Sequence, residues 1–463
     1  MFVNRERELE MLAARWMSDQ AEFIPVYGRR RVGKTTLLQV FCADKPHVFW
    51  VADLASEAEL LRGFSRALWE FAHPDERGPL FETWEQALRY AGELAAQTRL
   101  AVVIDEFPYA VAATPALPSI LQRMWDIHLQ RTRLFLVLSG SQIGMMEREV
   151  LFYRAPLYGR RTGQIELHPL RLRGVRDFFP HYTSQEQVEV YAILGGIPAY
   201  LALFDPHRSV SENIVAQILE PMGPLYDEPL FLLREELREP RLYLAVLRAI
   251  AGGRTRLNEI AQAVGLPPTS VSAYLSSLRG LRLVERRVPV TERRPEKSKR
   301  GLYHIRDPFF RFWFRFVSPR CSDLERGLWE GVLRTVEEQL GDYVAPVFEE
   351  LCREYVAALS AAGALSFTPE AVGGWWDRRA EVDVVALSWT ERQMLLGETK
   401  WWSRPVGVNV LRELQGKTQA ILPGPEWTAQ YVLFSRAGFT EALQRQAKDA
   451  GILLVEAVDL LGG

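Results

Sequence analysis

The sequence predicts an α/β protein that begins with a parallel, doubly wound sheet, and two observations support this fold class. Four short apolar runs predict strands, at 23–28, 47–52, 100–105 and 134–138. Segments with helical spacing separate them, and strands that are apolar along their whole length are typical of a sheet covered by helices on both faces. We expect this sheet to extend to about residue 165.

The composition is that of a globular protein with several domains. A chain of 463 residues suggests about three domains. Its 56 basic and 58 acidic residues give a net charge of −2, which argues against a protein that is basic throughout. The three cysteines are irregularly spaced and fit neither a disulfide framework nor a zinc site. The longest apolar stretch, 192–204, is too short to span a membrane, so we expect a cytoplasmic protein.

A phosphate-binding loop follows the first apolar run. The segment 28–35, GRRRVGKT, fits G-x-x-x-x-G-K-[ST] at every fixed position and lies between a predicted strand and a predicted helix. Lys34 would reach the β- and γ-phosphates of a nucleotide, and the Thr35 hydroxyl would bind Mg²⁺. The residues expected around the nucleotide are Gly28, Arg29, Arg30, Arg31, Val32, Gly33, Lys34, Thr35 and Thr36.

The third apolar run ends in two acids that would complete such a site. Asp105 would hold Mg²⁺, and Glu106 could polarise an attacking water. A glutamate directly after the aspartate favours hydrolysis over simple binding of the nucleotide. The fourth run is followed by Ser141, which could sense the γ-phosphate or belong to an ordinary turn.

A family resemblance rests on six blocks that occur in order: FVNRERELEML, YGRRRVGKTTLL, VVIDEF, LVLSGS, APLYGRRTGQIEL and GGIPAYL. Over about residues 1–320 the chain resembles the prokaryotic STAND-type AAA+ ATPases, also called archaeal ATPases. The resemblance implies an ASCE-type P-loop core, a helical lid and ATP as the nucleotide. It places Asn4 and Arg5 near the adenine, and Pro198 in the Gly-x-Pro element by which such lids touch the nucleotide.

Two adjacent arginines have a less certain assignment. Arg160 and Arg161 match arginines that the family resemblance places at the γ-phosphate or at a subunit interface. A local salt-bridge cluster would use the same residue types, so this alternative stays open. If the two arginines lie at a subunit interface, the protein would form a homo-oligomer, and this possibility also stays open.

The segments 241–251, 257–264 and 270–281 have the lengths and separations of a winged helix-turn-helix. The third helix offers polar groups to a DNA major groove, namely Ser270, Ser272, Tyr274 and Ser277. The segment 282–300 holds eight basic and three acidic residues, a local excess of five positive charges. We expect a flexible basic wing that contacts DNA phosphates, although winged helices also bind proteins and a charge run is often only a solvated face.

Acidic residues near the C-terminal end form a second candidate site. Asp383 lies in the predicted strand 381–387, and Glu398 and Lys400 end the predicted strand 394–400. If the two strands are antiparallel, Asp383 lies beside Glu398, and residues 398 and 400 point to one face. Asp383 and Glu398 would bind Mg²⁺ or Mn²⁺, and Lys400 would steady an attacking water.

This arrangement resembles the PD-(D/E)XK nuclease fold in the DUF234 form that is appended to archaeal ATPases. The resemblance adds a helix acid, which is Glu349 or its neighbour Glu350. Val382 departs from the pattern because many members have proline there. Gln415 and Lys417 on the following helix are candidate phosphate contacts. A restriction-like fold used only for binding or assembly remains the alternative.

We therefore expect four segments: a P-loop ATPase core (1–168), a helical lid (169–236), a winged helix (237–318) and a restriction-endonuclease-like α/β domain (319–463). The predicted function is ATP hydrolysis coupled to DNA binding and to metal-dependent DNA cleavage. Two other functions stay open. One is an ATP-driven signalling scaffold, and the other is a DNA-binding regulator with a non-cleaving C-terminal domain.

Overall fold

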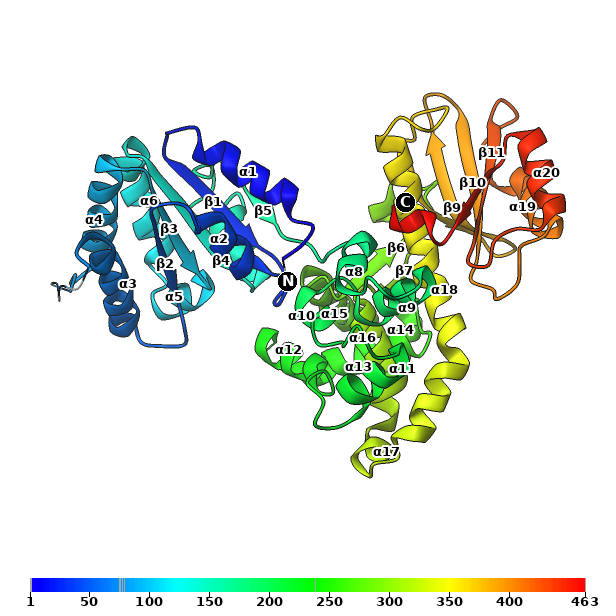
Figure 1. The fold of residues 1–463 in the computed structure, drawn as a ribbon, viewed down its shortest axis with the longest axis horizontal. Coiled ribbons are helices and arrows are strands. Elements are labelled where there is room, and N and C mark those ends of the chain that lie inside the picture. The colour runs from blue at the N-terminus through cyan, green and yellow to red at the C-terminus, as the bar shows by residue number, and fades with distance from the viewer. Residues whose placement is uncertain (1, 75, 77, 79, 238, 463) are drawn as a thin grey trace. The chain divides into compact units, whose positions relative to one another are not determined.

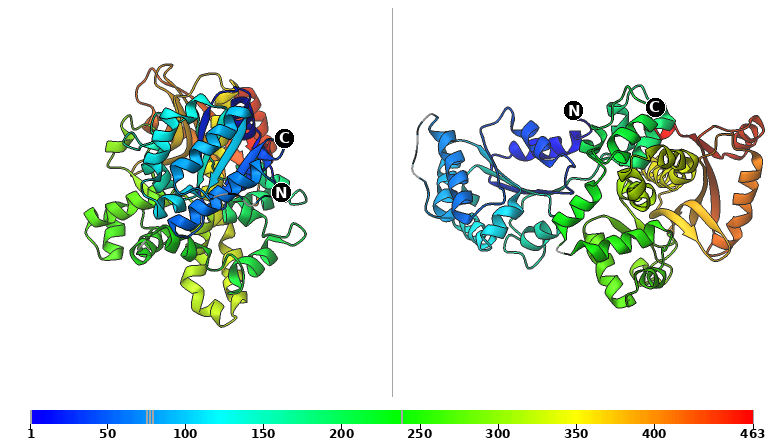
Figure 2. Two further views of the ribbon diagram at one scale, coloured as in Figure 1. Left: turned by 90° about the vertical axis from the view of Figure 1, so that its left-hand side faces the viewer. Right: turned by 90° about the horizontal axis from the view of Figure 1, so that it is seen from below.

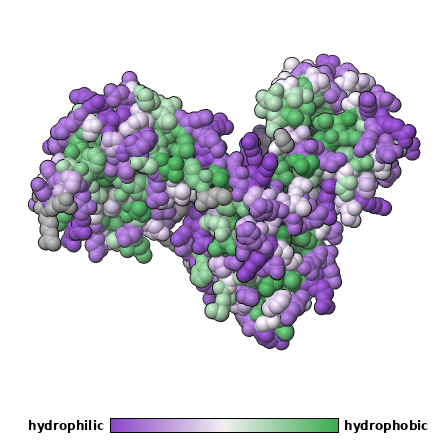
Figure 3. Space-filling view, viewed as in Figure 1, coloured by the Kyte–Doolittle hydropathy of each residue, from purple (hydrophilic) through white to green (hydrophobic). Residues whose placement is uncertain are grey.

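The structure is a computed structural model that describes residues 2–74, 76, 78, 80–237 and 239–462 (Figure 1). The chain forms two compact units. The first consists of Met1–Pro169 and Ile197–Ala199, and the second of Leu170–Gly196 and Tyr200–Gly463. Hydrophilic residues cover most of the visible face of each unit, with smaller hydrophobic groups between them (Figure 3).

The first unit contains a five-stranded parallel sheet in the order β2-β3-β4-β1-β5. Its strands are β1 (Glu22–Tyr27), β2 (His47–Val51), β3 (Leu100–Asp105), β4 (Leu134–Gly140) and β5 (Ile165–Glu166). Every residue of β1, β3 and β4 is buried. The sequence predicted the first four of these strands, and the structure confirms the α/β fold class.

Helices cover both faces of this sheet. They are α1 (Glu6–Trp16), α2 (Lys34–Cys42), α3 (Glu57–Ala72), α4 (Trp84–Gln97), α5 (Phe107–Ala113), α6 (Leu117–Ile127) and α7 (Ile143–Met146). On one face, rings from α1 and α2 pack on Phe135 of β4. On the other face, Trp50, Phe64 and Trp84 form an aromatic cluster with α3 and α4. The side chains of β4 alternate between the two faces, so one strand contributes to both cores.

The second unit starts with a helical segment. Its helices are α8 (Leu172–Phe178), α9 (Ser184–Leu194), α10 (Pro198–Leu201), α11 (Val210–Ile214) and α12 (Glu228–Glu236), of which α10 begins in the first unit. Thr183 and Glu186 form a capping box at the start of α9, which satisfies its first backbone N–H groups.

A winged helix-turn-helix follows, as the sequence predicted. It consists of α13 (Pro240–Ala251), α14 (Leu257–Val264), α15 (Pro268–Gly280) and the antiparallel strands β6 (Val284–Arg287) and β7 (Leu302–Ile305). The next helix, α16 (Pro308–Phe312), buries Phe309, Phe310 and Phe312. Its rings are therefore core residues.

The C-terminal part is a second α/β layer. Two helices, α17 (Cys321–Glu325) and the 33-residue α18 (Trp329–Ala361), precede the strands β8 (Ala371–Trp376), β9 (Glu381–Ser388), β10 (Gln393–Lys400), β11 (Thr428–Ser435) and β12 (Leu453–Glu456). The helices α19 (Val408–Ile421) and α20 (Glu441–Ala450) lie between the later strands in the chain. The sheet order is β12-β11-β10-β9-β8, with β8, β9 and β10 antiparallel and β10, β11 and β12 parallel. The helix α18 packs along this sheet (Figure 2).

Part of the basic segment 282–300, which was expected to be a flexible wing, contacts the C-terminal sheet. The Val290 N–H donates to the Gly374 carbonyl at 2.9 Å, and the Val290 side chain packs against the core of the C-terminal sheet. The Arg293 guanidinium lies 4.3 Å from the centre of the Trp389 ring. This part of the segment is docked because the apolar Val290 packs on a hydrophobic surface outside the winged helix, whereas the flexibility of the wing stays a prediction. Within the described residues, no helix combines the length and the apolar character needed to cross a bilayer.

Candidate functional site

The loop between β1 and α2 needs glycine at two places. Any side chain at Gly28 would clash with the carbonyl oxygen of Leu167, which follows β5. Gly33 has a φ of 97° and ends the loop at the first turn of α2. Arg31 also has a positive φ, of 66°, and Arg29 is buried. The loop is therefore a tight backbone curve held against the strand beside it.

Lys34 and Thr35 begin α2 and point to different partners. The Lys34 side chain is 5% exposed, and its Nζ donates to the carbonyls of Gly28 at 3.1 Å and Arg29 at 3.3 Å. The ammonium group thus lies over the loop that should surround phosphates. The Thr35 hydroxyl donates to Oδ2 of Asp105 at 2.6 Å.

The acids that follow β3 connect this loop to the end of β4. Oδ1 of Asp105 accepts from the Glu106 N–H at 3.0 Å. Oε2 of Glu106 accepts from the Ser141 hydroxyl at 2.8 Å and from the Ser141 N–H at 3.3 Å. Glu106 has a φ of 51°, a strained backbone conformation that in proteins clusters at functional sites. A continuous polar chain therefore runs from Thr35 through Asp105 and Glu106 to Ser141.

Arg5, which precedes α1, contacts the phosphate-binding loop between β1 and α2. Its side chain is buried and donates to the carbonyls of Val32 at 3.1 Å and His168 at 2.8 Å, and it also pairs with Glu8. The neighbouring Asn4 has a φ of 54°. These contacts join Arg5 to the end of the loop, whereas the expected position near adenine stays a prediction.

Of the other residues predicted to contact the nucleotide, Arg160 contacts an acid, and Arg161 contacts a backbone carbonyl and an aromatic ring. Arg160 forms a two-pronged ion pair with Asp126, at 2.8 and 2.7 Å. Arg161 donates to the Leu151 carbonyl at 3.2 Å and lies over the Tyr158 ring. Pro198 belongs to the short segment that groups with the first unit. The ion pair of Arg160 is the kind of local cluster that the sequence left open.

The C-terminal acids occupy the end of the β9–β10 pair. These strands are antiparallel, and the last paired residues, Val384 and Gly397, directly adjoin Asp383 and Glu398. Oδ2 of Asp383 accepts from the Thr399 N–H at 2.8 Å and from its hydroxyl at 3.0 Å. Burial raises the pKa of Asp383, and the charge of Glu398 raises it further.

Both carboxylate oxygens of Glu398 accept hydrogen bonds from lysines. The Lys400 ammonium lies 2.7 Å from Oε1, and the Lys417 ammonium lies 2.9 Å from Oε2. Lys417 therefore contacts an acid in this structure, and Gln415 is exposed. Among the described side chains, no three of the His, Cys, Asp and Glu type converge as a ready metal site. A cation there would need oxygen ligands from water or substrate in addition.

The structure distinguishes the two adjacent helix acids of α18. Glu350 pairs with Arg287 of β6 and, at 3.5 Å, with Arg311 of α16. Burial alone would raise the pKa of Glu350, but the two arginines hold it below its usual value. Glu349 instead lies near Asp383, because Arg353 contacts both residues, and burial and then the charge of Asp383 raise the pKa of Glu349. Glu349 is therefore the acid that joins Asp383.

Sequence reasoning missed two polar residues of this cluster. Arg353 donates to the Asp383 carbonyl at 2.6 Å and lies 3.6 Å from Glu349. Its position four residues after Glu349 was a usable signal, because that spacing places both on one helix face. Thr399, which binds Asp383, carried no signal in the sequence.

Comparisons with known proteins identify three regions of the chain. Residues 2–204 match the model of an ATPase domain predominantly from Archaea. Residues 243–288 match an IclR helix-turn-helix domain, and residues 313–411 match DUF234, which describes archaeal and bacterial proteins of unknown function.

Individual proteins are also similar. An uncharacterized protein of Methanocaldococcus jannaschii is 34% identical over 402 residues, covering 87% of this chain and 88% of the relative. An uncharacterized ATP-binding protein of the same organism is 53% identical over 45 residues, which is 10% of this chain and 76% of the relative. A Walker-type ATPase of Pyrococcus abyssi shares the fold with a TM-score of 0.53 and 21% identity, covering 68% of this chain and 96% of that one.

Proposed function

Because this chain belongs to the archaeal ATPase family that carries a C-terminal DUF234 region, and is an ATP-hydrolysing enzyme, we propose that its ATP cycle controls DNA binding and DNA cleavage. We assign hydrolysis to residues 1–168, a lid to 169–236, DNA binding to 237–318 and cleavage to 319–463. The observation that carries the assignment of hydrolysis is the polar chain from Thr35 to Ser141, which joins the phosphate loop to the ends of β3 and β4.

Residues of the phosphate-binding loop and of the ends of β3 and β4 have different roles in ATP hydrolysis. Lys34 binds the β- and γ-phosphates, and Glu106 orients and polarises the attacking water. The Thr35 hydroxyl and the Asp105 carboxylate, 2.6 Å apart, are oxygen ligands of the type that Mg²⁺ prefers. When bound there, Mg²⁺ would neutralise charge that develops on the phosphates. Ser141 holds Glu106 in place until the γ-phosphate competes for its hydroxyl.

The nucleotide state would control DNA binding by changing the conformation of the protein. Bound ATP would favour one arrangement of the lid and the winged helix, and hydrolysis would release it, as expected for STAND-type proteins. The exposed Ser272 and Ser277 of α15 support a role in reading DNA. In the docked wing, Arg294, Lys297 and Lys299 are exposed and would contact phosphates from a fixed position.

Cleavage is assigned to the C-terminal sheet. Asp383 and Glu398 would hold Mg²⁺ or Mn²⁺, Glu349 would complete the acidic group, and Lys400 would position the attacking water. The element order α18-β8-β9-β10-α19-β11 supports this assignment, because it places a helix acid, a strand acid and Glu398-x-Lys400 on adjacent elements.

A DNA-cleavage panel tests the assignment. Purified protein is incubated with duplex, single-stranded and branched DNA, with Mg²⁺ or Mn²⁺, and with or without ATP. We expect metal-dependent cutting that Asp383→Asn abolishes, and ATP hydrolysis that Lys34→Ala abolishes and Asp383→Asn leaves intact. Full ATP hydrolysis in Lys34→Ala would overturn the assigned nucleotide site.

A binding-only C-terminal domain is the second candidate, and one observation favours it. Glu398 is already neutralised by Lys400 and Lys417, so a cation must compete with two ammonium groups. In that case the chain would act as an ATP-driven scaffold or a DNA-binding regulator. Absence of cutting on every DNA of the panel, with binding retained, would select this candidate.

A further inference from the structure

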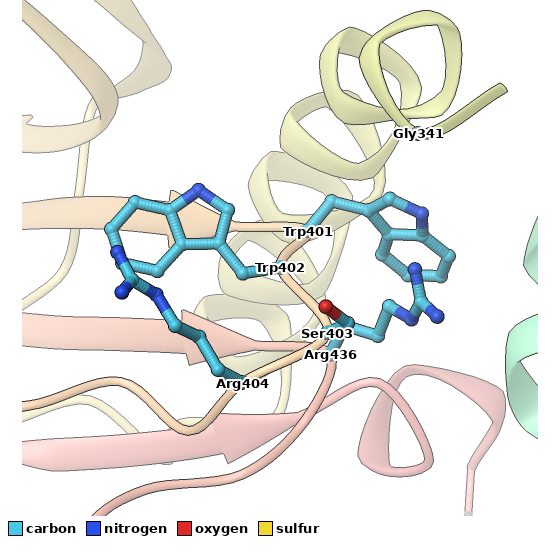
Figure 4. A pocket seen from close by; sticks show the side chains of 6 residues that line it. All are labelled: Gly341, Trp401, Trp402, Ser403, Arg404 and Arg436. Carbon is cyan, nitrogen blue, oxygen red and sulfur yellow. The ribbon is translucent and has the colours of Figure 1, made fainter. Parts of the chain in front are cut away.

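A small cavity opens where β10 ends. Four consecutive residues after this strand line it, Trp401, Trp402, Ser403 and Arg404, together with Gly341 of α18 and Arg436, which follows β11 (Figure 4). Its volume is about 360 Å³. That value lies at the lower end of the range for ligand sites, which is roughly 300–1,000 Å³. The cavity therefore suits one small planar or charged group.

The lining combines aromatic rings with positive charge. The Arg436 guanidinium lies 5.2 Å from the centre of the Trp401 ring, and the Arg404 guanidinium lies 5.1 Å from that of Trp402. In Figure 4 the two indoles extend to opposite sides of the chain, each with one of these arginines beside it. The six lining residues include no acid. A ligand for this lining must be anionic and must tolerate contact with aromatic rings.

The Trp401 indole carries a donor that protein groups leave unused. The Trp401 residue is 6% exposed and packs against Phe348 of α18. Its Nε1–H is buried, and within the described part of the chain no acceptor lies within hydrogen-bonding distance of it. Buried donors are almost always paired, so the unpaired donor of this lining residue is available to an acceptor that a ligand brings beside it. This observation is independent of the arginines.

The cavity adjoins the carboxylate cluster through one residue. The Lys400 ammonium lies 5.5 Å from the centre of the Trp402 ring and also binds Glu398 at 2.7 Å. A strand positioned for cleavage at Glu398 would therefore bring its neighbouring nucleotide to Trp402.

We propose that this cavity binds one unpaired nucleotide of a DNA strand. Its phosphate would contact Arg436 and the Trp401 Nε1–H on one side of the chain, and its base would stack on Trp402 beside Arg404 on the other. The inference rests on the proposed function, and it names the substrate class of that site, namely single-stranded DNA or a branched DNA with an unpaired strand. Stacking on aromatic rings beside cations binds bases of any sequence, but it requires an unpaired base.

Binding can be measured apart from cleavage. The full chain carrying Asp383→Asn is titrated against a fluorescein-labelled single strand and the matching duplex, and anisotropy reports affinity. We expect the single strand to bind more tightly, and Trp401→Phe or Arg404→Gln to weaken its binding about tenfold, as for loss of one hydrogen bond to a charged group. The matched controls are Trp329→Phe, at the start of α18, and Arg412→Gln, an exposed arginine of α19.

Several outcomes would overturn the inference. The first is that Trp401→Phe and Arg404→Gln bind the single strand as the control variants do while melting at the wild-type temperature. The second is that the matching duplex binds as tightly as the single strand, because the inference requires an unpaired base. The third is competition by a nucleoside monophosphate or inorganic phosphate at equal strength to the strand, which would identify a free phosphate as the ligand. If these variants weaken binding but the unmodified chain cuts no DNA, the proposed cleavage fails and the nucleotide site stands.

Discussion

The two units each place acids at the end of a strand, but they hold them in different ways. In the first unit, Asp105 and Glu106 accept from hydroxyl and amide groups. In the second unit, Glu398 accepts from two lysine ammonium groups. Neutral donors orient a carboxylate and leave its negative charge available to a cation, whereas ammonium groups cancel that charge. If the proposed metal sites are correct, the acids of the nucleotide site are already oriented for Mg²⁺, whereas a metal bound by Glu398 would have to displace a lysine ammonium group.

The largest expected effect concerns Glu106. In Glu106→Gln the side chain can still accept from Ser141, but it can no longer polarise water as a carboxylate does. We expect ATP hydrolysis to fall by about 10²- to 10⁴-fold with ATP binding retained. Phosphate release and equilibrium dialysis with labelled ATP measure the two properties. Hydrolysis within a few-fold of the unchanged protein would show that another residue activates the water.

A second test uses the adjacent acids of α18. Glu350→Gln removes the partner of Arg287 and Arg311 and should lower the free energy of unfolding by about 2 kcal/mol, less than for a fully buried ion pair because the three side chains are partly exposed. Glu349→Gln is the matched control. It relieves repulsion from Asp383 and should leave stability unchanged or raise it. Urea denaturation measures both. Equal losses in the two variants would contradict their different roles.

The pH dependence of stability tests the surroundings of the same ion pair. Burial, and then the charge of Arg287, lower the pKa of His304 to about 4. A folded-state pKa below the unfolded one means that the unfolded chain binds more protons, so this contribution is complete above about pH 6.5 and is lost as the pH falls toward 4. His304→Gln should reduce the loss of stability between pH 7 and pH 5 by about 2 kcal/mol. Identical pH profiles from urea denaturation would refute the assignment.

The smallest effect expected is at Lys417. Lys417→Met removes one of the two ammonium groups on Glu398 and should tighten Mn²⁺ binding at the C-terminal site by about three- to tenfold. Electron paramagnetic resonance of Mn²⁺ in ATP-free protein measures this affinity, with Lys448→Met on the exposed face of α20 as the control. Weaker Mn²⁺ binding in Lys417→Met would mean that the lysine supports the metal.

Local patterns were sufficient to predict much of the fold and many positions of the candidate sites. The strands of the first sheet were found because each is apolar throughout, and the phosphate loop because its residue types and spacing follow from the backbone curve. Asp383, Glu398 and Lys400 were placed together from strand alternation alone. In contrast, β8 was missed, because its AVGGWW sequence has two central glycines that weaken the strand signal.

The P-loop, the adjacent acids Asp105 and Glu106 and the helices of the winged helix each depend on residue types and spacings within a short stretch of the chain. The sequence by itself was therefore enough to predict them. Tertiary structure decided which surfaces meet. It docked Val290 on Gly374, paired Glu350 with Arg287 and thereby left Glu349 to face Asp383. It also formed an open cavity beside the Trp401 indole. These outcomes depend on packing and desolvation between residues that lie tens of positions apart, and no local pattern encodes them.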